Sequence, residues 1–180
     1  MGDGVALNEI VYTMETIKKS IEVEAPLHEV YDQWSHFAEF PRFMEGVQSV
    51  TKVDSRHLHW VAEVGGQRRE WDAEIDQQVS DQKIAWHSTG GAVNSGTIDF
   101  LATDPQHTLI KLRMDYKPQG MIERMGSSLG ILSRRVEGDL ERFKQHIQKH
   151  ETSNSSRNTG SRQTKPNLAA DYDTSGKSGV

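Results

Sequence analysis

The stretch that decides the fold is Gly120 to His150, GMIERMGSSLGILSRRVEGDLERFKQHIQKH. Its large apolar residues recur every three or four positions, the spacing that lines up one face of an α-helix. They are Ile122, Met125, Leu129, Leu132, Val136, Leu140, Phe143 and Ile147. The opposite face is polar and carries Glu123, Arg124, Ser127, Arg134, Arg135, Glu141, Arg142 and Lys144. A helix of this length would run roughly 40 Å, and its apolar stripe must be buried against another element.

The chain between residues 13 and 118 can bury this stripe, because most of it alternates between apolar and polar residues as β-strands do. The segment 70–76 alternates strictly, and Gly65-Gly66 before it predicts a hairpin turn. Two short helices are expected after the first strand, one beginning at Pro26 and one across the aromatic residues of 37–44. The sequence therefore predicts an α+β fold, with a curved antiparallel sheet of about seven strands against one long C-terminal helix.

Composition narrows the classes of function. The chain has 180 residues, a formal net charge of -5 and no cysteine. The acidic balance gives no reason to expect nucleic acid as a partner, and the lack of cysteine excludes disulfides and thiolate metal sites. We recognise neither a membrane span nor a signal peptide, so we expect a cytoplasmic protein without stable membrane insertion.

The same composition predicts three parts along the chain. Residues 1–12 are expected to be a flexible lead-in, and residues 13–150 a folded domain. Residues 151–180 are expected to be a disordered polar tail, because they contain too few large apolar residues to offset the entropy of ordering.

Several short motifs occur in an order that points to a family. They are Ile21-Glu-Val-Glu-Ala-Pro26, Val30-Tyr31 with Trp34, Phe40-Pro41-Arg42-Phe43-Met44, His59-Trp60-Val61-Ala62-Glu63, Ile84-Ala85-Trp86 and Met114-Asp115-Tyr116. Over about residues 13–150 the chain resembles the START/Bet v 1-like (SRPBCC) superfamily, specifically its polyketide cyclase/dehydrase and coenzyme Q-binding group. The resemblance implies a helix-grip fold with a cavity under the long helix. It leaves the activity open, because this fold hosts lipid carriers, hormone receptors, cyclases and ribosome-associated proteins.

The candidate ligand site consists of residues that strand alternation and the helical stripe turn inward, with two more near the mouth. These ligand-binding candidates are Phe40, Met44, Trp60, Trp71, Trp86, Met114, Tyr116, Met121, Met125 and Leu129. Taken alone, such an apolar set favours a filled core, because apolar stripes most often mark packing. The resemblance favours an apolar pocket for a flat or chain-like molecule, to whose shape methionine side chains adapt.

Gly126 and Gly130 leave two interpretations open for the first half of the helix. Either they permit a kink that lets this half move as a lid, or they allow close contact with an aromatic residue of the sheet.

His57 and His59 share one strand face, but no third ligand stands at a suitable spacing, so we expect no metal. We also expect no cofactor.

Groups for acid–base catalysis are hard to place inside the sheet. The polar residues that are candidates to face the cavity are Ser88, Ser95, Thr97 and Tyr116. The parity of Arg113, Asp115 and His87 points them outward instead. The same holds for the four carboxylates of the 70–76 segment, which we expect to face water.

These observations favour a binding protein over an enzyme, since no ionisable residue takes a clearly inward position. We expect it to bind or carry a small hydrophobic molecule such as a lipid, a quinone, an isoprenoid or a polyketide. The alternative is an aromatase/cyclase-like enzyme that acts on a polyketide. A third hypothesis follows from the resemblance, namely a binding protein associated with ribosomes or respiratory membranes. The sequence gives no indication of the oligomeric state.

Overall fold

The computed structural model describes residues 14–64, 66–117 and 128–159. The strands are β1 (Glu15–Val23), β2 (Val47–Lys52), β3 (His57–Val64), β4 (Gln67–Val79), β5 (Lys83–Gly91), β6 (Asn94–Asp104) and β7 (His107–Tyr116). The helices are α1 (Leu27–Ser35), the 3₁₀-helix η1 (Phe37–Arg42) and α3 (Ser128–Thr159). This element order confirms the predicted α+β fold with two short helices after the first strand.

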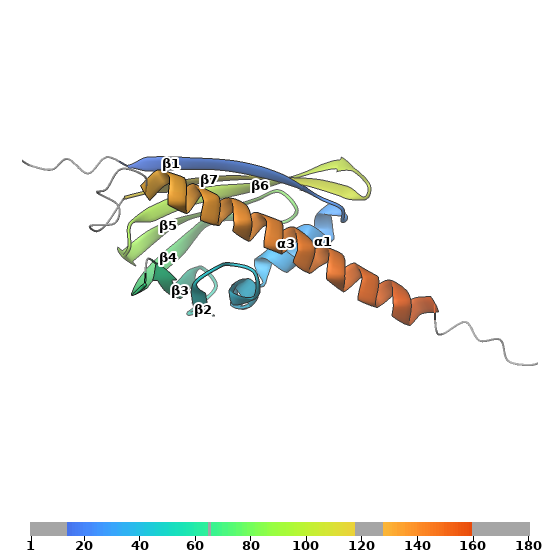
Figure 1. The fold of residues 1–180 in the computed structure, drawn as a ribbon, viewed down its shortest axis with the longest axis horizontal. Helices are drawn as coiled ribbons and strands as arrows, with labels where there is room; N and C mark the ends of the chain where they lie inside the picture. Colours follow the sequence, from blue (N-terminus) through green and yellow to red (C-terminus); the bar gives the residue numbers. More distant parts are fainter. Residues whose placement is uncertain (1–13, 65, 118–127, 160–180) are drawn as a thin grey trace, which may run out of the picture.

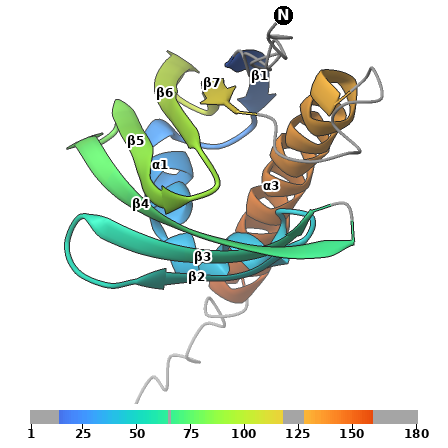
Figure 2. The same cartoon turned by 90° about the vertical axis from the view of Figure 1, so that its left-hand side faces the viewer.

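The strands form one antiparallel sheet of seven in the order β1-β7-β6-β5-β4-β3-β2. Consecutive strands from β2 to β7 are neighbours, so this part of the chain is a meander. β1 returns to pair with β7, which places β1 and β2 at opposite edges, and α1 with η1 connects them. Figure 2 shows the sheet curling around α3, the helix-grip arrangement.

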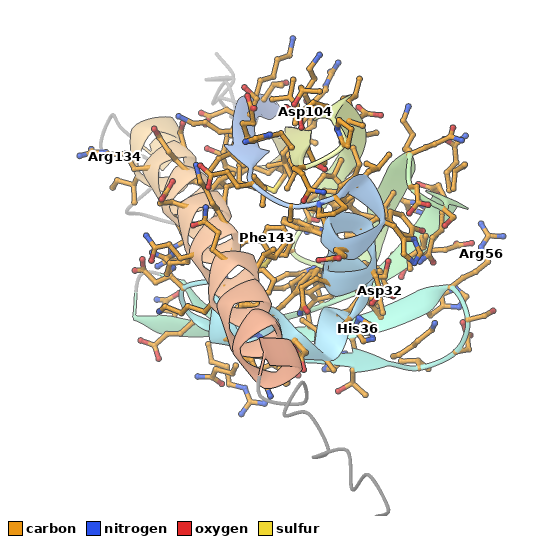
Figure 3. All side chains as sticks on the ribbon, turned by 90° about the vertical axis from the view of Figure 1, so that its right-hand side faces the viewer. Asp32, His36, Arg56, Asp104, Arg134 and Phe143 are labelled. Carbon is orange, nitrogen blue, oxygen red and sulfur yellow. The ribbon has the colours of Figure 1, made fainter. Side chains whose placement is uncertain are left out.

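A cluster of aromatic side chains joins α1 and η1 to the second half of α3. The ring of Phe143 lies 4.7 Å from that of Trp34 and 5.0 Å from that of Phe43, measured between centroids. Phe40 lies 5.5 Å from Trp34 in the same way. In Figure 3, Phe143 points from α3 toward α1. This cluster fills one end of the sheet and includes the helix that the aromatic residues of 37–44 predict.

The two halves of α3 are buried to different degrees. Leu140, Phe143 and Ile147 are at most 4 % exposed and pack in the core. Val136 and Leu132, one and two turns before Leu140 on the same stripe, are only half-buried, and Ile131 beside Leu132 is 51 % exposed. The stripe therefore packs tightly only along its second part.

The bounds of α3 differ from the predicted ones. The helix continues to Thr159, so residues 151–159, predicted as the start of a disordered tail, are helical. These turns project beyond the sheet in Figure 1. The predicted helix start at Gly120 lies outside the described residues. In the described part of the chain, no helix combines the length and apolar character needed to cross a membrane.

Lys19 sits on the inward face of the edge strand β1. The register between β1 and β7 is regular on both sides of it, with Lys19 opposite Leu112. Its ammonium lies 2.7 Å from the Glu137 carboxylate on α3. An inward charge is a common feature of edge strands, and here it also ties the edge of the sheet to the helix.

Candidate functional site: a cavity between α3 and the sheet

A cavity of about 270 Å³ lies between the sheet and the part of α3 from Leu132 to Leu140. Most of its lining is aromatic or aliphatic and comes from the inward face of strands β3 to β7. Trp34, Phe37 and Phe40 line the end where the aromatic cluster fills the sheet. The half-buried residues of α3 thus border a space instead of a packed layer.

Seven of the ten predicted ligand-binding residues line this cavity. They are Phe40, Met44, Trp60, Trp71, Trp86, Met114 and Tyr116. Met121 and Met125 lie outside the described residues, and the structure does not describe the side chain of Leu129. That these residues hold a ligand stays a prediction, but the structure does bring the seven together around one space.

Trp60 and Trp71 form a flat aromatic surface in the cavity wall. They are direct cross-strand partners on β3 and β4, and their rings stack with centroids 5.3 Å apart and an interplanar angle of 13°. The ring of Phe40 lies 5.5 Å from that of Trp60. The indole Nε1 of Trp60 is buried, and no described residue accepts a hydrogen bond from it.

Trp86 is held differently on β5. Its Nε1 donates to Oδ1 of Asn94 at 3.1 Å, and the Asn94 amide nitrogen donates to the Ala92 carbonyl at 3.0 Å. Its ring lies against Gly96 on β6, where an added Cβ would stand 2.5 Å from the Trp86 ring. Gly96 is therefore required for the position of this indole.

Several polar residues line the cavity that the sequence reasoning did not select. Arg69 has the same strand parity as Trp71 and faces inward, so parity alone identifies it. Asn94 follows the turn after β5, and Lys117 follows the end of β7. Strand periodicity does not extend to these positions, so it cannot predict which way their side chains face. Tyr116, which the sequence does select, donates its hydroxyl hydrogen to the carboxylate of Glu15 on β1.

Other polar candidates take different positions. Ser88, Ser95 and Thr97 are not among the described lining residues, and Ser88 Oγ instead accepts from the Asn94 backbone N–H. Asp115 lies on the outer face as expected, where it accepts from Thr16. That hydrogen bond is the main cause of its lowered pKa.

A charged cluster borders the cavity where α3 meets the loop between η1 and β2. Asp139 Oδ1 accepts from the Glu45 backbone N–H at 2.8 Å and also from Arg142. Arg142 Nε donates to the Phe43 carbonyl at 2.8 Å, and Arg135 donates to the Glu63 carbonyl at 3.3 Å. Burial raises the pKa of Asp139, although these hydrogen bonds and the arginines oppose that shift.

The position of Arg135 corrects the sequence interpretation of the helix face. The sequence groups Arg134 and Arg135 as polar, solvated residues. Figure 3 shows Arg134 pointing away from the sheet, but the Arg135 side chain is only 23 % exposed and lines the cavity. Arg135 is three positions after Leu132, so it lies on the flank of the apolar stripe and not opposite it.

The histidines of the outer sheet face are each paired with a carboxylate. His57 contacts Asp54, His59 contacts Asp72 and His87 contacts Asp76, each with an N–O distance between 2.7 and 2.9 Å. Within residues 14–64, 66–117 and 128–159 there is no group of three or more His, Asp or Glu side chains arranged to hold a metal ion.

The glycine pair of α3 is described only in part. Among the described residues, nothing lies within 4 Å of a Cβ added at Gly130, so close contact with a described aromatic residue does not explain this glycine. Gly126 lies outside the described residues, so the kink interpretation stays a prediction.

Comparison with known proteins agrees with this architecture. Residues 23–145 match the family described as polyketide cyclase / dehydrase and lipid transport. The chain belongs to this family. An uncharacterized 17.2 kDa protein of Streptomyces lincolnensis, from the melC2-rnhH intergenic region, is 41 % identical over 136 residues, which cover 75 % of this chain and 91 % of that protein.

Solved structures with the same fold include an aromatase/cyclase. The Zhui aromatase/cyclase of Streptomyces sp. R1128 superposes with a TM-score of 0.66 at 14 % identity, covering 76 % of this chain and 95 % of that one. A START superfamily protein of Mycobacterium smegmatis gives a TM-score of 0.56 at 18 % identity, covering 71 % and 97 %. At these identities the likeness establishes the fold.

Proposed function

We propose that this protein binds a small hydrophobic molecule in the cavity between α3 and the sheet. The observation that carries the proposal is the incomplete burial of the α3 stripe. Leu132 and Val136 border about 270 Å³ of space, whereas Phe143 and Ile147 further along the same stripe are packed in the core. A single packed core would not leave a space of this size, because protein interiors are close-packed.

The lining suits an apolar ligand with a few polar atoms. Aromatic side chains dominate the walls, and polar groups such as Arg69, Asn94 and Tyr116 are few. Ligand pockets typically combine these two features, with the apolar surface for affinity and the polar groups for orientation. The family and the fold fit such a role.

A second candidate is a polyketide cyclase-like enzyme, and the inward Arg69 favours it. A guanidinium in an apolar site could polarise a ketone of a polyketide chain. Such a reaction also needs a general base with access to the substrate. The lining carboxylates Glu45 and Asp139 are engaged with Arg135 and Arg142, so we favour binding over catalysis.

Native mass spectrometry of freshly purified protein, followed by organic extraction, tests the proposal. We expect an additional mass at a stoichiometric level and an apolar molecule in the extract. A quinone would support a carrier, and a cyclised polyketide would support the enzyme. A mass equal to the bare polypeptide, together with no binding to quinones, fatty acids and aromatic ketones, would contradict the proposal.

A further inference from the structure

Arg135 places a positive charge in the wall of a mostly apolar cavity. Its side chain lines the space between α3 and the sheet, and only 23 % of it is exposed. Removing a charge from water to this extent costs free energy unless the charge is paired and hydrogen-bonded. The partners of the guanidinium therefore decide whether the protein satisfies it without a ligand.

The described protein satisfies this guanidinium only in part. Over residues 14–64, 66–117 and 128–159, its one hydrogen bond runs from Nη1 to the Glu63 carbonyl at 3.3 Å. Glu45 Oε1 lies 3.7 Å from Nη2, which is too long for a hydrogen bond, and the Glu45 side chain is 60 % exposed. An exposed ion pair of this kind contributes little. Because a guanidinium carries five N–H donors, most of them remain for water or for a ligand.

The backbone around Arg135 fixes the position of its guanidinium. Gly46 has a φ of +76°, and a Cβ added there would stand 2.4 Å from the Glu63 carbonyl oxygen and 3.5 Å from Arg135 Nη1. Glu63 N–H in turn donates to the Gly46 carbonyl at 2.7 Å. Glycine thus keeps this corner narrow, and the Glu63 carbonyl holds the guanidinium at the border of the cavity.

Two carboxylates near Arg135 restrict the charge of a ligand that binds there. Glu45 and Asp139 also line the cavity. Asp139 accepts from the Glu45 backbone N–H and from Arg142, so it leaves the donors of Arg135 unused. The two negative charges repel a dianion such as a phosphate about twice as strongly as a monoanion. A carboxylate carries a single charge, and its two oxygens match the guanidinium fork.

We propose that Arg135 binds the carboxylate of an apolar acid whose hydrocarbon part lies in the cavity. The stacked rings of Trp60 and Trp71 give this part a flat apolar wall. Arg135 then makes the protein select an acid over a neutral compound of the same shape. This inference rests on the proposed function and adds the chemical class of the ligand.

The test compares 2-naphthoate with 2-naphthamide at pH 7.5, two compounds of nearly the same shape that differ in charge. Isothermal titration calorimetry gives the ratio of their dissociation constants for wild-type protein, Arg135→Gln and Arg134→Gln. Comparing this ratio between proteins cancels the difference in hydration between the compounds. We expect the preference for naphthoate to fall at least about tenfold in Arg135→Gln, the effect of a hydrogen bond between charged groups.

Arg134→Gln is the matched control. It removes the same charge from the same helix, but Arg134 points away from the sheet and donates to the Gly130 carbonyl (Figure 3). We expect this variant to keep the wild-type preference. An equal fall in both variants would trace the preference to the net charge of the protein and overturn the inference.

A spectroscopic measurement on wild-type protein covers the case in which Arg135→Gln does not fold. The Nε–H resonance of Arg135 in a ¹H–¹⁵N spectrum should shift with naphthoate and not with naphthamide. Equal ratios in wild-type and Arg135→Gln, or no selective shift, would overturn the inference, while the proposed function stands because both compounds still bind. If neither compound binds up to its solubility limit, the proposed function loses its support together with the inference.

Discussion

Asp139 is a half-buried carboxylate that holds α3 to the loop between η1 and β2. Its Oδ1 accepts from the Glu45 backbone N–H and from Arg142, and its side chain is 16 % exposed. Asp139→Ala leaves both donors without this acceptor, so we expect the free energy of unfolding to fall by about 1–3 kcal/mol. Urea denaturation measures this loss. Glu141→Ala, an exposed carboxylate on the same helix, is the control and should change stability by less than about 0.5 kcal/mol. Equal losses in the two variants would contradict the structural role of Asp139.

Asp54 gives the turn between β2 and β3 a dependence on acidity. The backbone N–H groups of Arg56 and His57, together with the His57 side chain, lower the pKa of Asp54 to about 2. A carboxyl whose pKa is lowered by folding stabilises the fold above its ordinary pKa near 3.9, and this contribution is lost as the pH falls toward 2. We expect Asp54→Asn to have a lower Tm than wild type at pH 7. Thermal melts followed by circular dichroism between pH 7 and pH 2 should show this difference shrinking below about pH 4. A difference that is independent of pH would show that the charge is not involved.

At the scale of single residues, the sequence predicts which side chains face the cavity where strand or helix periodicity applies. It does not predict the contacts of long side chains, which depend on how far the side chain extends. Strand parity places Trp60, Trp71 and Trp86 around the cavity, and the same rule, applied to Arg69, would have found an ionisable inward residue. Its charge alone predicts a place for Arg135 on the polar face of the helix. Its long side chain instead reaches the Glu63 carbonyl across the cavity border, a contact that no local pattern contains.

At the scale of single elements, the meander was predictable but the end of α3 was not. Alternation and Gly65-Gly66 predict strands β3 and β4, since each strand has one apolar face. Residues 151–159 lack an apolar stripe, so periodicity contains no information on whether the helix continues through them. The helix is observed to Thr159, yet its last described buried residue is Ile147.

Removal of residues 152–180 tests how far the folded domain extends. Because the described buried stripe ends at Ile147, we expect the truncated protein to keep its Tm nearly unchanged. Its ellipticity at 222 nm should weaken, since the helical turns of 152–159 are lost. Circular dichroism gives both quantities in one experiment. A fall in Tm of many degrees would mean that the removed segment packs against the domain.

The two halves of α3 should respond differently to the same substitution. Ile147 is 4 % exposed and packs in the core, so Ile147→Ala should cost about 2–5 kcal/mol. Leu132 borders the cavity, where its methyl groups already lack neighbours on one side, so Leu132→Ala should cost about 1 kcal/mol or less. Urea denaturation of both variants measures the difference. Similar costs would mean that the first half of the stripe is packed as tightly as the second.

At the scale of the whole molecule, the sequence predicted the layers but not whether the space between them is filled. A stripe of apolar residues indicates which way a helix faces, and gives no information on its distance from the sheet. The curl of the sheet and the packing of Phe143 against Trp34 set that distance, and both depend on contacts remote in sequence. Association with ribosomes or respiratory membranes, the third hypothesis, would need a basic surface, and α3 offers little of one, because Arg135 and Arg142 donate to the Glu63 and Phe43 carbonyls.

Filling the cavity separates binding from folding. Val136 is half-buried on α3 and lines the cavity, so the larger side chain in Val136→Trp should occupy the ligand space. We expect this variant to lose binding of apolar molecules by at least about tenfold, while its Tm stays close to that of wild type, because the added ring enters existing space instead of a packed layer. Ile131→Trp makes the same kind of change on the same helix at a position that is 51 % exposed, and it should bind as wild type does. Titration with the compound recovered by extraction, or with 1-tetralone, measures the three affinities. Unchanged binding in Val136→Trp would place the ligand elsewhere on the protein, and a large loss of Tm would show that the space beside Val136 is already filled.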